Sequence, residues 1–167
     1  MFDASRVCGV ELVPQLIEAL DVKYSSNTRV KILEQDITDP NLAFDTKFDL
    51  VNAIGVMFHI TNDNDWEWAL RNICDSINQG GVVIVGGQFG LISRDIGFAN
   101  KDEFSSLEEM GAQNETNQVL VTKRIRSLGR WRKMAQNLGL EVHALIKSDK
   151  PKYMSAPENN VLILRKP

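Results

Sequence analysis

Six short runs rich in β-branched residues constrain the fold of this chain more than any other feature. They lie at residues 7–11, 30–35, 48–53, 82–86, 141–146 and 161–165. Several are almost continuously apolar, which is typical of strands that are covered on both faces. Helical or turn segments precede most of the runs. This alternation predicts an α/β fold, with right-handed crossovers and a mostly parallel sheet that is flanked by helices.

Three segments between the runs have the apolar spacing of helices. The first covers residues 14–20 and the last covers residues 127–138. In the second and clearest helix, we expect Asn64 or Asp65 to be the cap and the glycine pair at 80–81 to mark the end. Apolar residues recur in it at steps of three and four, namely Trp66, Leu70, Ile73, Cys74 and Ile77.

The composition is that of one ordinary globular domain. The chain has 167 residues, of which 43% are hydrophobic and 25% are charged, and we expect a single domain over residues 1–167. Residues 90–118 have no regular pattern and are predicted to form an irregular insertion, a kind of segment that often carries function. The net charge of −3 gives no general attraction to nucleic acid or to anionic lipid.

The few cysteines and histidines exclude several kinds of site. Cys8 and Cys74 are too few for a disulfide framework and indicate a reducing compartment. His59 and His143 have no cysteine or paired carboxylate at ligand spacing, so no metal site is predicted. No apolar run approaches the ~18 residues of a membrane span, and the first residues do not form a signal peptide. We therefore expect a cytoplasmic protein without a membrane partner.

Two carboxylates stand at the ends of predicted strands, where open parallel sheets bind their ligands. Glu11 ends the first run and can accept hydrogen bonds from both hydroxyls of a ribose. The alternative is a solvated carboxylate that is stabilised by the dipole of the next helix. Asp36 ends the second run and can accept a hydrogen bond from an exocyclic amine such as that of adenine, with Ile37 as an apolar face for the ring. The alternative is a turn aspartate, since residues 38–40 are a good turn signal.

The third run, residues 48–53, leads into an apolar segment that contains His59. Asp49 near the start of the run is predicted to be structural. His59 is a candidate general base, because the pKa of histidine lies near the working pH. The alternative is a packed and hydrogen-bonded histidine, which is the commoner role in an apolar run.

A group of basic residues lies around the last predicted helix. We expect it to form the solvated face of that helix, with Trp131 turned inward. A phosphate-bearing ligand is the alternative partner for these charges. The members are Lys123, Arg124, Arg126, Arg130, Arg132 and Lys133.

The order and spacing of four elements resemble the class I S-adenosylmethionine-dependent methyltransferases. The similarity covers nearly the whole chain and is weakest over residues 90–126. It implies a Rossmann-like sheet with an antiparallel C-terminal edge strand. The four elements are Gly9-Val10-Glu11-Leu12-Val13-Pro14, Glu34-Gln35-Asp36-Ile37, Phe48-Asp49-Leu50-Val51 and Asn78-Gln79-Gly80-Gly81-Val82.

The resemblance implies S-adenosylmethionine as the cofactor. Glu11 would hold the ribose hydroxyls, and Asp36 would accept from the adenine amine. Leu12 and Ile37 would lie beside the adenine ring, and residues 52–53 would lie near the methionine portion and the reactive methyl group. The implied cofactor-binding residues are therefore Glu11, Leu12, Asp36, Ile37, Asn52 and Ala53.

The resemblance also implies that part of the family's pattern is absent. The first strand of the family and its Gly-x-Gly-x-Gly loop have no counterpart, since residues 1–6 look like the end of the helix that follows that loop. On this interpretation the chain is truncated at its N-terminus, and cofactor binding is weakened or lost. The strands that lose a neighbour would carry unpaired backbone groups, through which the chain could self-associate.

The implied function is methyl transfer from S-adenosylmethionine to a small-molecule or glycan acceptor, with residues 90–118 as the acceptor loop. The sulfonium is already an activated donor, so alignment supplies most of the catalysis and only His59 is a candidate catalytic residue. One alternative is a non-catalytic fragment or partner subunit that keeps the fold. Another is an NAD-dependent oxidoreductase, which shares the ribose-binding acid. Whether this chain is itself an active enzyme stays open at this point.

Overall fold

Strands and helices alternate through most of the chain in the structure, which is a computed structural model. It describes residues 4–88, 95–99, 104–106, 121–147 and 159–167. In chain order the elements are β1 (Val7–Glu11), α1 (Pro14–Tyr24), β2 (Val30–Glu34), β3 (Phe48–Ile54), α2 (Asp63–Ser76), β4 (Ile77–Gln88), β5 (Ile96–Ala99), β6 (Phe104–Ser106), β7 (Val121–Ile125), α4 (Leu128–Asn137), β8 (Glu141–Ile146) and β9 (Asn159–Arg165).

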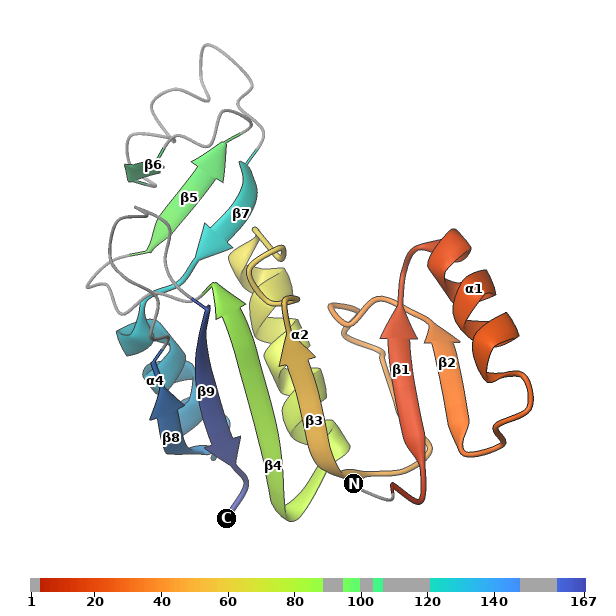
Figure 1. The fold of residues 1–167 in the computed structure, drawn as a ribbon. Coiled ribbons are helices and arrows are strands. Elements are labelled where there is room, and N and C mark those ends of the chain that lie inside the picture. Colours follow the sequence, from red (N-terminus) through yellow and green to blue (C-terminus); the bar gives the residue numbers. More distant parts are fainter. Residues whose placement is uncertain (1–3, 89–94, 100–103, 107–120, 148–158) are drawn as a thin grey trace.

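The strands form three hydrogen-bonded groups (Figure 1). β1 and β2 are a parallel pair, and β3, β4, β9 and β8 are a four-stranded sheet in that order. Within this sheet β3 and β4 are parallel, while β9 is antiparallel to both of its neighbours. β6, β5 and β7 make a small antiparallel sheet. The predicted α/β architecture with an antiparallel pair at the C-terminal edge is confirmed.

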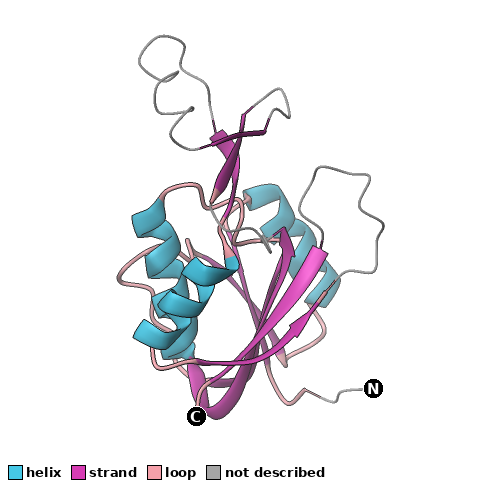
Figure 2. Cartoon of the chain, turned by 90° about the vertical axis from the view of Figure 1, so that its left-hand side faces the viewer, coloured by secondary structure: helices cyan, strands magenta, loops and turns pink. Residues whose placement is uncertain are grey.

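α2 and α4 cover the same face of the four-stranded sheet. Trp66 of α2 and Trp131 of α4 are 0% and 3% exposed, and their rings meet edge to face with centroids 4.9 Å apart. Together with Leu70, Val83 and Leu162 they belong to one continuous core. α1 packs beside β1 and β2, and helices stand on either side of the strands in Figure 2. The core therefore joins α2, α4 and the four-stranded sheet.

The register of the four-stranded sheet separates a covered face from an open face. Val51 pairs with Val83 and Ala53 pairs with Val85, and all of these side chains except the half-buried Val51 are buried below α2 and α4. Alternate residues of a strand point to opposite faces. Leu50 and Ile54 consequently point to the other face, and they are 53% and 55% exposed.

The second helix differs from the prediction at both ends. Its cap is Asn62, whose Oδ1 accepts hydrogen bonds from the backbone N–H groups of Asn64 and Asp65, the two residues that were expected to cap it. The helix ends at Ser76, and the glycine pair at 80–81 lies inside the range of β4. Here the backbone of the pair bonds to Lys166 after β9, so pairing with the C-terminal strand replaces the expected helix terminus.

The segment predicted to be irregular contains two strands. β5 and β6 pair with each other, and β5 also pairs with β7. These strands have no clear sequence signal because they are short, and β7, the other partner of β5, lies much further along the chain. Phe104–Ser106, within the range expected to be irregular, is β6. The rest of the expected insertion lies outside the described residues.

Candidate functional site

The carboxyl ends of β1, β2 and β3 lie at one end of the molecule, as their arrowheads in Figure 1 show. Glu11 is the last residue of β1, and Asp36 follows β2 by two residues. Asn52 and Ala53 lie near the carboxyl end of β3. The sequence-predicted site residues are therefore placed at the strand ends where parallel sheets bind ligands.

Glu11 is held by the start of α1. Its Oε1 accepts hydrogen bonds from the backbone N–H groups of Leu12, at 2.7 Å, and Val13, at 2.9 Å. Val13 is the cap residue of α1 and supplies no side-chain cap, so the Glu11 carboxylate satisfies donors near the helix start. Within the described residues, the other oxygen, Oε2, has no hydrogen-bond partner. The carboxylate is thus fixed in orientation and retains one oxygen for a ligand.

Asp36 forms a turn, as predicted by the alternative interpretation of this residue as a turn aspartate. Its Oδ1 accepts a hydrogen bond from the backbone N–H of Thr38 at 2.8 Å. This is an Asx turn, and it orients the half-buried carboxyl group after β2. The turn does not exclude a ligand, because a carboxylate has further acceptor positions. Ile37, the next residue, packs against the core and is only partly available as a face for a ring.

Asn72 of α2 fixes the loop that carries Asp36 and Ile37. Its Nδ2 donates to the backbone carbonyl of Ile37 at 2.7 Å and to that of Asp39 at 2.8 Å. Asn72 is 6% exposed, so its amide is a buried polar group that both bonds satisfy. Asn72 is not among the site residues that were predicted from the sequence. One sequence signal pointed to it, because Asn72 lies next to the apolar positions of the clearest predicted helix. An asparagine in such a place is expected to be buried, and a buried amide needs hydrogen-bond partners.

Asn52 and Ala53 point to opposite faces of β3. Asn52 is exposed, and its Oδ1 accepts from the backbone N–H of Ile54 at 3.2 Å. The side chain of Ala53 is 5% exposed and belongs to the core, so only the backbone of Ala53 is available for contact. Gly55 follows with a φ of +79°, a conformation that side chains disfavour, and its N–H bonds to Gly86. This turn ends β3 next to the candidate site.

His59 lies on the turn that follows β3. Its ring is exposed and packs on the ring of Phe58, with centroids 4.2 Å apart and an angle of 39° between the planes. The backbone carbonyl of Phe58 accepts from the N–H of Arg124, which ties this turn to β7. The exposed imidazole is accessible to an acceptor, and its role as a general base stays a prediction.

The basic group does not form a solvated helix face, and that expectation is wrong for three of its members. Arg124, Arg126 and Arg130 all pair with Asp63 at the start of α2, at 2.8, 3.0 and 2.8 Å. Arg130 also pairs with Asp95 at 2.8 Å. The side chain of Arg126 is 1% exposed, and it additionally donates to two backbone carbonyls. The ion pairs of these charges join β7 and α4 to the start of α2.

Burial and charge shift the pKa values inside this arginine cluster in defined directions. Burial alone would raise the pKa of Asp63, but the charge of Arg124 and hydrogen bonds from Arg130 and Arg126 leave it below the usual value. Burial lowers the pKa of Arg126 to about 10, against the opposing effect of Asp63. The guanidinium carbon of Arg126 lies 4.5 Å from the centroid of the Trp66 ring, a cation–π contact. The cluster thus anchors the core instead of exposing free positive charge.

A small cavity lies beside the arginine cluster, lined among others by Met57, Phe58, Trp66 and Arg124. Its volume of about 10 Å³ is the space of one water molecule. Trp66 Nε1 and Arg124 Nε are buried without a hydrogen-bond partner in the described part of the chain. A water molecule is the natural partner for such donors, and the cavity is too small to receive a substrate.

Comparison with solved structures identifies the fold. N-methyltransferase NodS from Bradyrhizobium japonicum, in complex with S-adenosyl-L-homocysteine, has a TM-score of 0.62 at 11% identity, over 97% of this chain and 67% of that chain. A S-adenosylmethionine-dependent methyltransferase from Clostridium acetobutylicum has a TM-score of 0.65 at 13% identity, over 96% and 74%. This chain has the fold of the class I S-adenosylmethionine-dependent methyltransferases.

Further comparisons agree with the class I methyltransferase fold. A TehB-like S-adenosylmethionine-dependent methyltransferase from Corynebacterium glutamicum gives a TM-score of 0.61 at 18% identity, over 97% of this chain and 68% of that chain. Residues 1–81 match the family described as a methyltransferase domain. No curated protein matches the sequence. The chain spans about two thirds to three quarters of these three solved methyltransferases.

Among the residues that the structure describes, no helix is long and apolar enough to cross a membrane.

Proposed function

We propose that this chain binds S-adenosylmethionine at the carboxyl ends of β1, β2 and β3 and serves methyl transfer to a small-molecule or glycan acceptor. In this proposal Glu11 accepts from the ribose hydroxyls and Asp36 accepts from the adenine amine. Leu12 and Ile37 flank the adenine ring. The methionine portion lies near Asn52 and the backbone of Ala53.

The preoriented Glu11 carboxylate is the observation that carries the proposal. Two backbone N–H groups hold Oε1, and Oε2 is left for a ribose hydroxyl. Hydrogen bonds to a charged acceptor are worth about 1.5–3 kcal/mol, and a fixed carboxylate loses little entropy on binding. Leu12 is 56% exposed directly beside Glu11, so an apolar surface is available for the base that the ribose carries.

The methyl-transfer step requires little from the protein beyond the alignment of the acceptor with the methyl group. When bound, the cofactor supplies an activated methyl group on its sulfonium. The chain would position the acceptor against that methyl group, and His59 on the exposed turn after β3 would remove a proton where the acceptor has one to lose. A solved structural neighbour, 1,6-didemethyltoxoflavin-N1-methyltransferase from Burkholderia thailandensis, is bound to its small-molecule substrate, which favours a small-molecule acceptor here as well.

Cofactor binding by these 167 residues alone is expected to be weak. Glu11 and Asp36 belong to the β1–β2 pair, whereas Asn52 belongs to the four-stranded sheet, and no strand ladder joins the two groups among the described residues. A cofactor that contacts both groups of strands must order them relative to each other, and this ordering reduces the net free energy of cofactor binding. This observation favours a second hypothesis, in which the chain is one part of a larger assembly and is not catalytic alone.

Calorimetric titration of the whole chain with S-adenosylhomocysteine tests the proposal. We expect one site per chain with a dissociation constant between roughly 10 µM and 1 mM, and no heat with NAD at the same concentrations. Absence of binding at millimolar S-adenosylhomocysteine would contradict a cofactor site in this chain. Binding of S-adenosylhomocysteine without methyl transfer to any small-molecule acceptor would support the hypothesis that the chain is not catalytic alone.

A further inference from the structure

The segment that leads from β3 to α2, residues 55–62, is neither helix nor strand, and it carries His59. We call it the β3–α2 turn, and Figure 1 shows it beside β7. At its start, the N–H of Gly55 bonds to the carbonyl of Gly86 at 2.9 Å. Within it, the N–H of His59 bonds to the carbonyl of Val56 at 3.0 Å. Contacts with distant parts of the chain fix the rest of the turn.

Two arginines at the end of β7 bind the backbone of the β3–α2 turn. Arg124 donates through its backbone N–H and through Nη1, and Arg126, the residue just after β7, donates through Nη1 and Nη2. The acceptors are the carbonyl groups of Phe58, Ile60, Thr61 and Asn62, at 2.8, 2.9, 3.0 and 3.1 Å. Nearly every carbonyl from residue 58 to residue 62 is therefore bound by one of these arginines.

Stability alone does not account for a guanidinium at this place. The side chain of Arg126 is 1% exposed, and a buried ion pair is often no more stabilising than apolar residues of the same volume. A guanidinium offers a rigid, planar set of donors, which binds several acceptors at fixed positions. Asp63 balances the charge by pairing with Arg124 and Arg126 at 2.8 and 3.0 Å. The arrangement is therefore suited to fixing the shape of the β3–α2 turn.

The fixed backbone determines where the imidazole of His59 lies. Arg124 binds the carbonyl of the preceding residue, Phe58, and the Phe58 ring packs on the His59 ring with centroids 4.2 Å apart. Gly87 at the end of β4 leaves room for the Phe58 ring, because a Cβ atom there would lie 3.0 Å from Phe58 Cε1. The exposed imidazole is consequently held through its backbone and on one face of its ring.

We propose that Arg124 and Arg126 are positioning residues that hold the β3–α2 turn and thereby fix His59 near the carboxyl end of β3. This inference rests on the proposed function, in which His59 removes a proton from the acceptor. Each arginine acts through the carbonyl groups that it binds and does not touch the acceptor. A general base must lie within hydrogen-bond reach of the proton, and a misplacement of about 1 Å can lower the rate about 100-fold. A turn that is rigid before the acceptor binds avoids this loss.

Relaxation measurements on the ligand-free whole chain test the proposal independently of any cofactor. In Arg124→Gln, at a side chain that is 17% exposed, we expect the order parameter of the His59 amide to fall from about 0.85 to below about 0.6. Arg126→Lys keeps the charge but loses the planar set of donors, so it should lower the same order parameter. Histidine-selective labelling gives two imidazole signals, from His59 and His143, and only that of His59 should shift.

Asp95→Asn is the matched control for a purely structural role of the cluster. Asp95 pairs with Arg130 at 2.8 Å and accepts from the N–H of Ser127, so it belongs to the same network but contacts a different segment. This variant should lower the urea midpoint of unfolding and leave the His59 amide rigid. An unchanged order parameter of His59 in both arginine variants would overturn the proposal, and so would an equal loss of order in Asp95→Asn.

A parallel titration separates this proposal from the cofactor site. S-adenosylhomocysteine should bind both arginine variants within about twofold of the wild-type affinity, because the proposed cofactor contacts at Glu11 and Asp36 lie outside the β3–α2 turn. A wild type that binds no S-adenosylhomocysteine would contradict the proposed function, while the order parameter of His59 still decides whether the arginines hold the turn. A large loss of affinity in both arginine variants would contradict a role confined to His59.

Discussion

At the residue scale, Glu11 combines a structural and a functional role. One carboxylate oxygen satisfies the backbone at the start of α1, and the other is free within the described residues. The two interpretations of Glu11 from the sequence, a ribose ligand and a carboxylate at a helix start, are therefore compatible. The same holds for Asp36, whose Asx turn with Thr38 orients the carboxyl group without using all of its acceptor positions.

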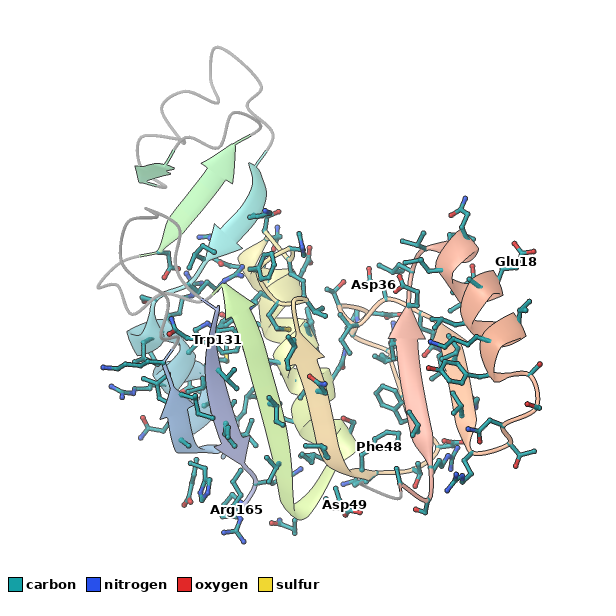
Figure 3. All side chains as sticks on the ribbon, in the orientation of Figure 1. Glu18, Asp36, Phe48, Asp49, Trp131 and Arg165 are labelled. Carbon is teal, nitrogen blue, oxygen red and sulfur yellow. The ribbon has the colours of Figure 1, made fainter. Side chains whose placement is uncertain are left out.

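Replacing Glu11 by glutamine separates the two roles. Glu11→Gln keeps an oxygen for the N–H groups of Leu12 and Val13 but removes the charge that would bind the ribose. We expect S-adenosylhomocysteine affinity to fall about tenfold or more, while the free energy of unfolding changes by less than about 0.5 kcal/mol. Glu18→Gln on the exposed side of α1 (Figure 3) is the control and should leave both unchanged. Equal affinities of the wild type and Glu11→Gln would remove Glu11 from the site.

Asp63 is the centre of the arginine cluster. Asp63→Asn leaves the buried guanidinium of Arg126 with only part of its partners, and it also weakens the contacts of Arg124 and Arg130. We expect the free energy of unfolding to fall by roughly 1–3 kcal/mol in urea denaturation. Asp65→Asn, an exposed residue of the same helical turn, should change it by less than about 0.5 kcal/mol. Similar effects of the two changes would mean that the cluster contributes nothing to stability.

The stability that Asp63 supplies depends on pH in a defined direction. Its pKa in the folded chain lies below the ordinary value of 3.8, so the folded state favours the charged form. The stabilisation is fully present above the unfolded pKa and is lost as the pH falls through the folded pKa. We therefore expect the stability difference between wild type and Asp63→Asn to be constant from about pH 7 to pH 5 and to shrink below about pH 4. A difference that widens on acidification would contradict this assignment.

At the scale of the elements, the sequence predicted most of the strands because their apolar runs have sharp ends. β1 and β8 match the expected ranges residue for residue. The start of α2 was missed because Asn62, Asn64 and Asp65 are all competent caps, and the choice depends on which side chain reaches the backbone. The extension of β4 back to Ile77 depends on the pairing of Ile77 with Phe48 of β3 and on the backbone bonds of residues 80–81 to Lys166, which no local pattern records.

The candidate site was predictable only where a residue lies at or just after the end of a strand that has a clear sequence pattern. Glu11 and Asp36 were found from their places after strands. Asn72 and the Arg126–Asp63 pair were not, because their partners lie 35 and 63 residues away along the chain. Contacts at such separations follow from the packing of elements, and a single sequence carries no direct record of them.

Asn72 couples α2 to the loop after β2. Asn72→Ala removes two hydrogen bonds and leaves the carbonyls of Ile37 and Asp39 without this partner. We expect unfolding free energy to fall by roughly 1–3 kcal/mol, with faster amide exchange in residues 36–42. Asp75→Ala, at an exposed position of the same helix, is the control and should leave the exchange of that loop unchanged. If both variants exchange alike, Asn72 does not position the loop.

At the scale of the whole molecule, the strands form a β1–β2 pair, a four-stranded sheet and a small antiparallel sheet. Among the described residues, β1 and β3 each have an edge without a strand partner, and these edges face each other. The core lies wholly on the side of α2 and α4, and the residues proposed to hold the two ends of the cofactor are divided between the β1–β2 pair and the four-stranded sheet.

Nuclear magnetic resonance of the labelled whole chain, titrated with S-adenosylhomocysteine, shows directly whether the cofactor binds at these strand ends. We expect shifts concentrated at the amides of Leu12, Ile37 and Asn52, saturating at roughly millimolar ligand, with Glu18 unaffected. Shifts confined to other parts of the chain, or no shifts at that concentration, would contradict a cofactor site at the carboxyl ends of β1, β2 and β3.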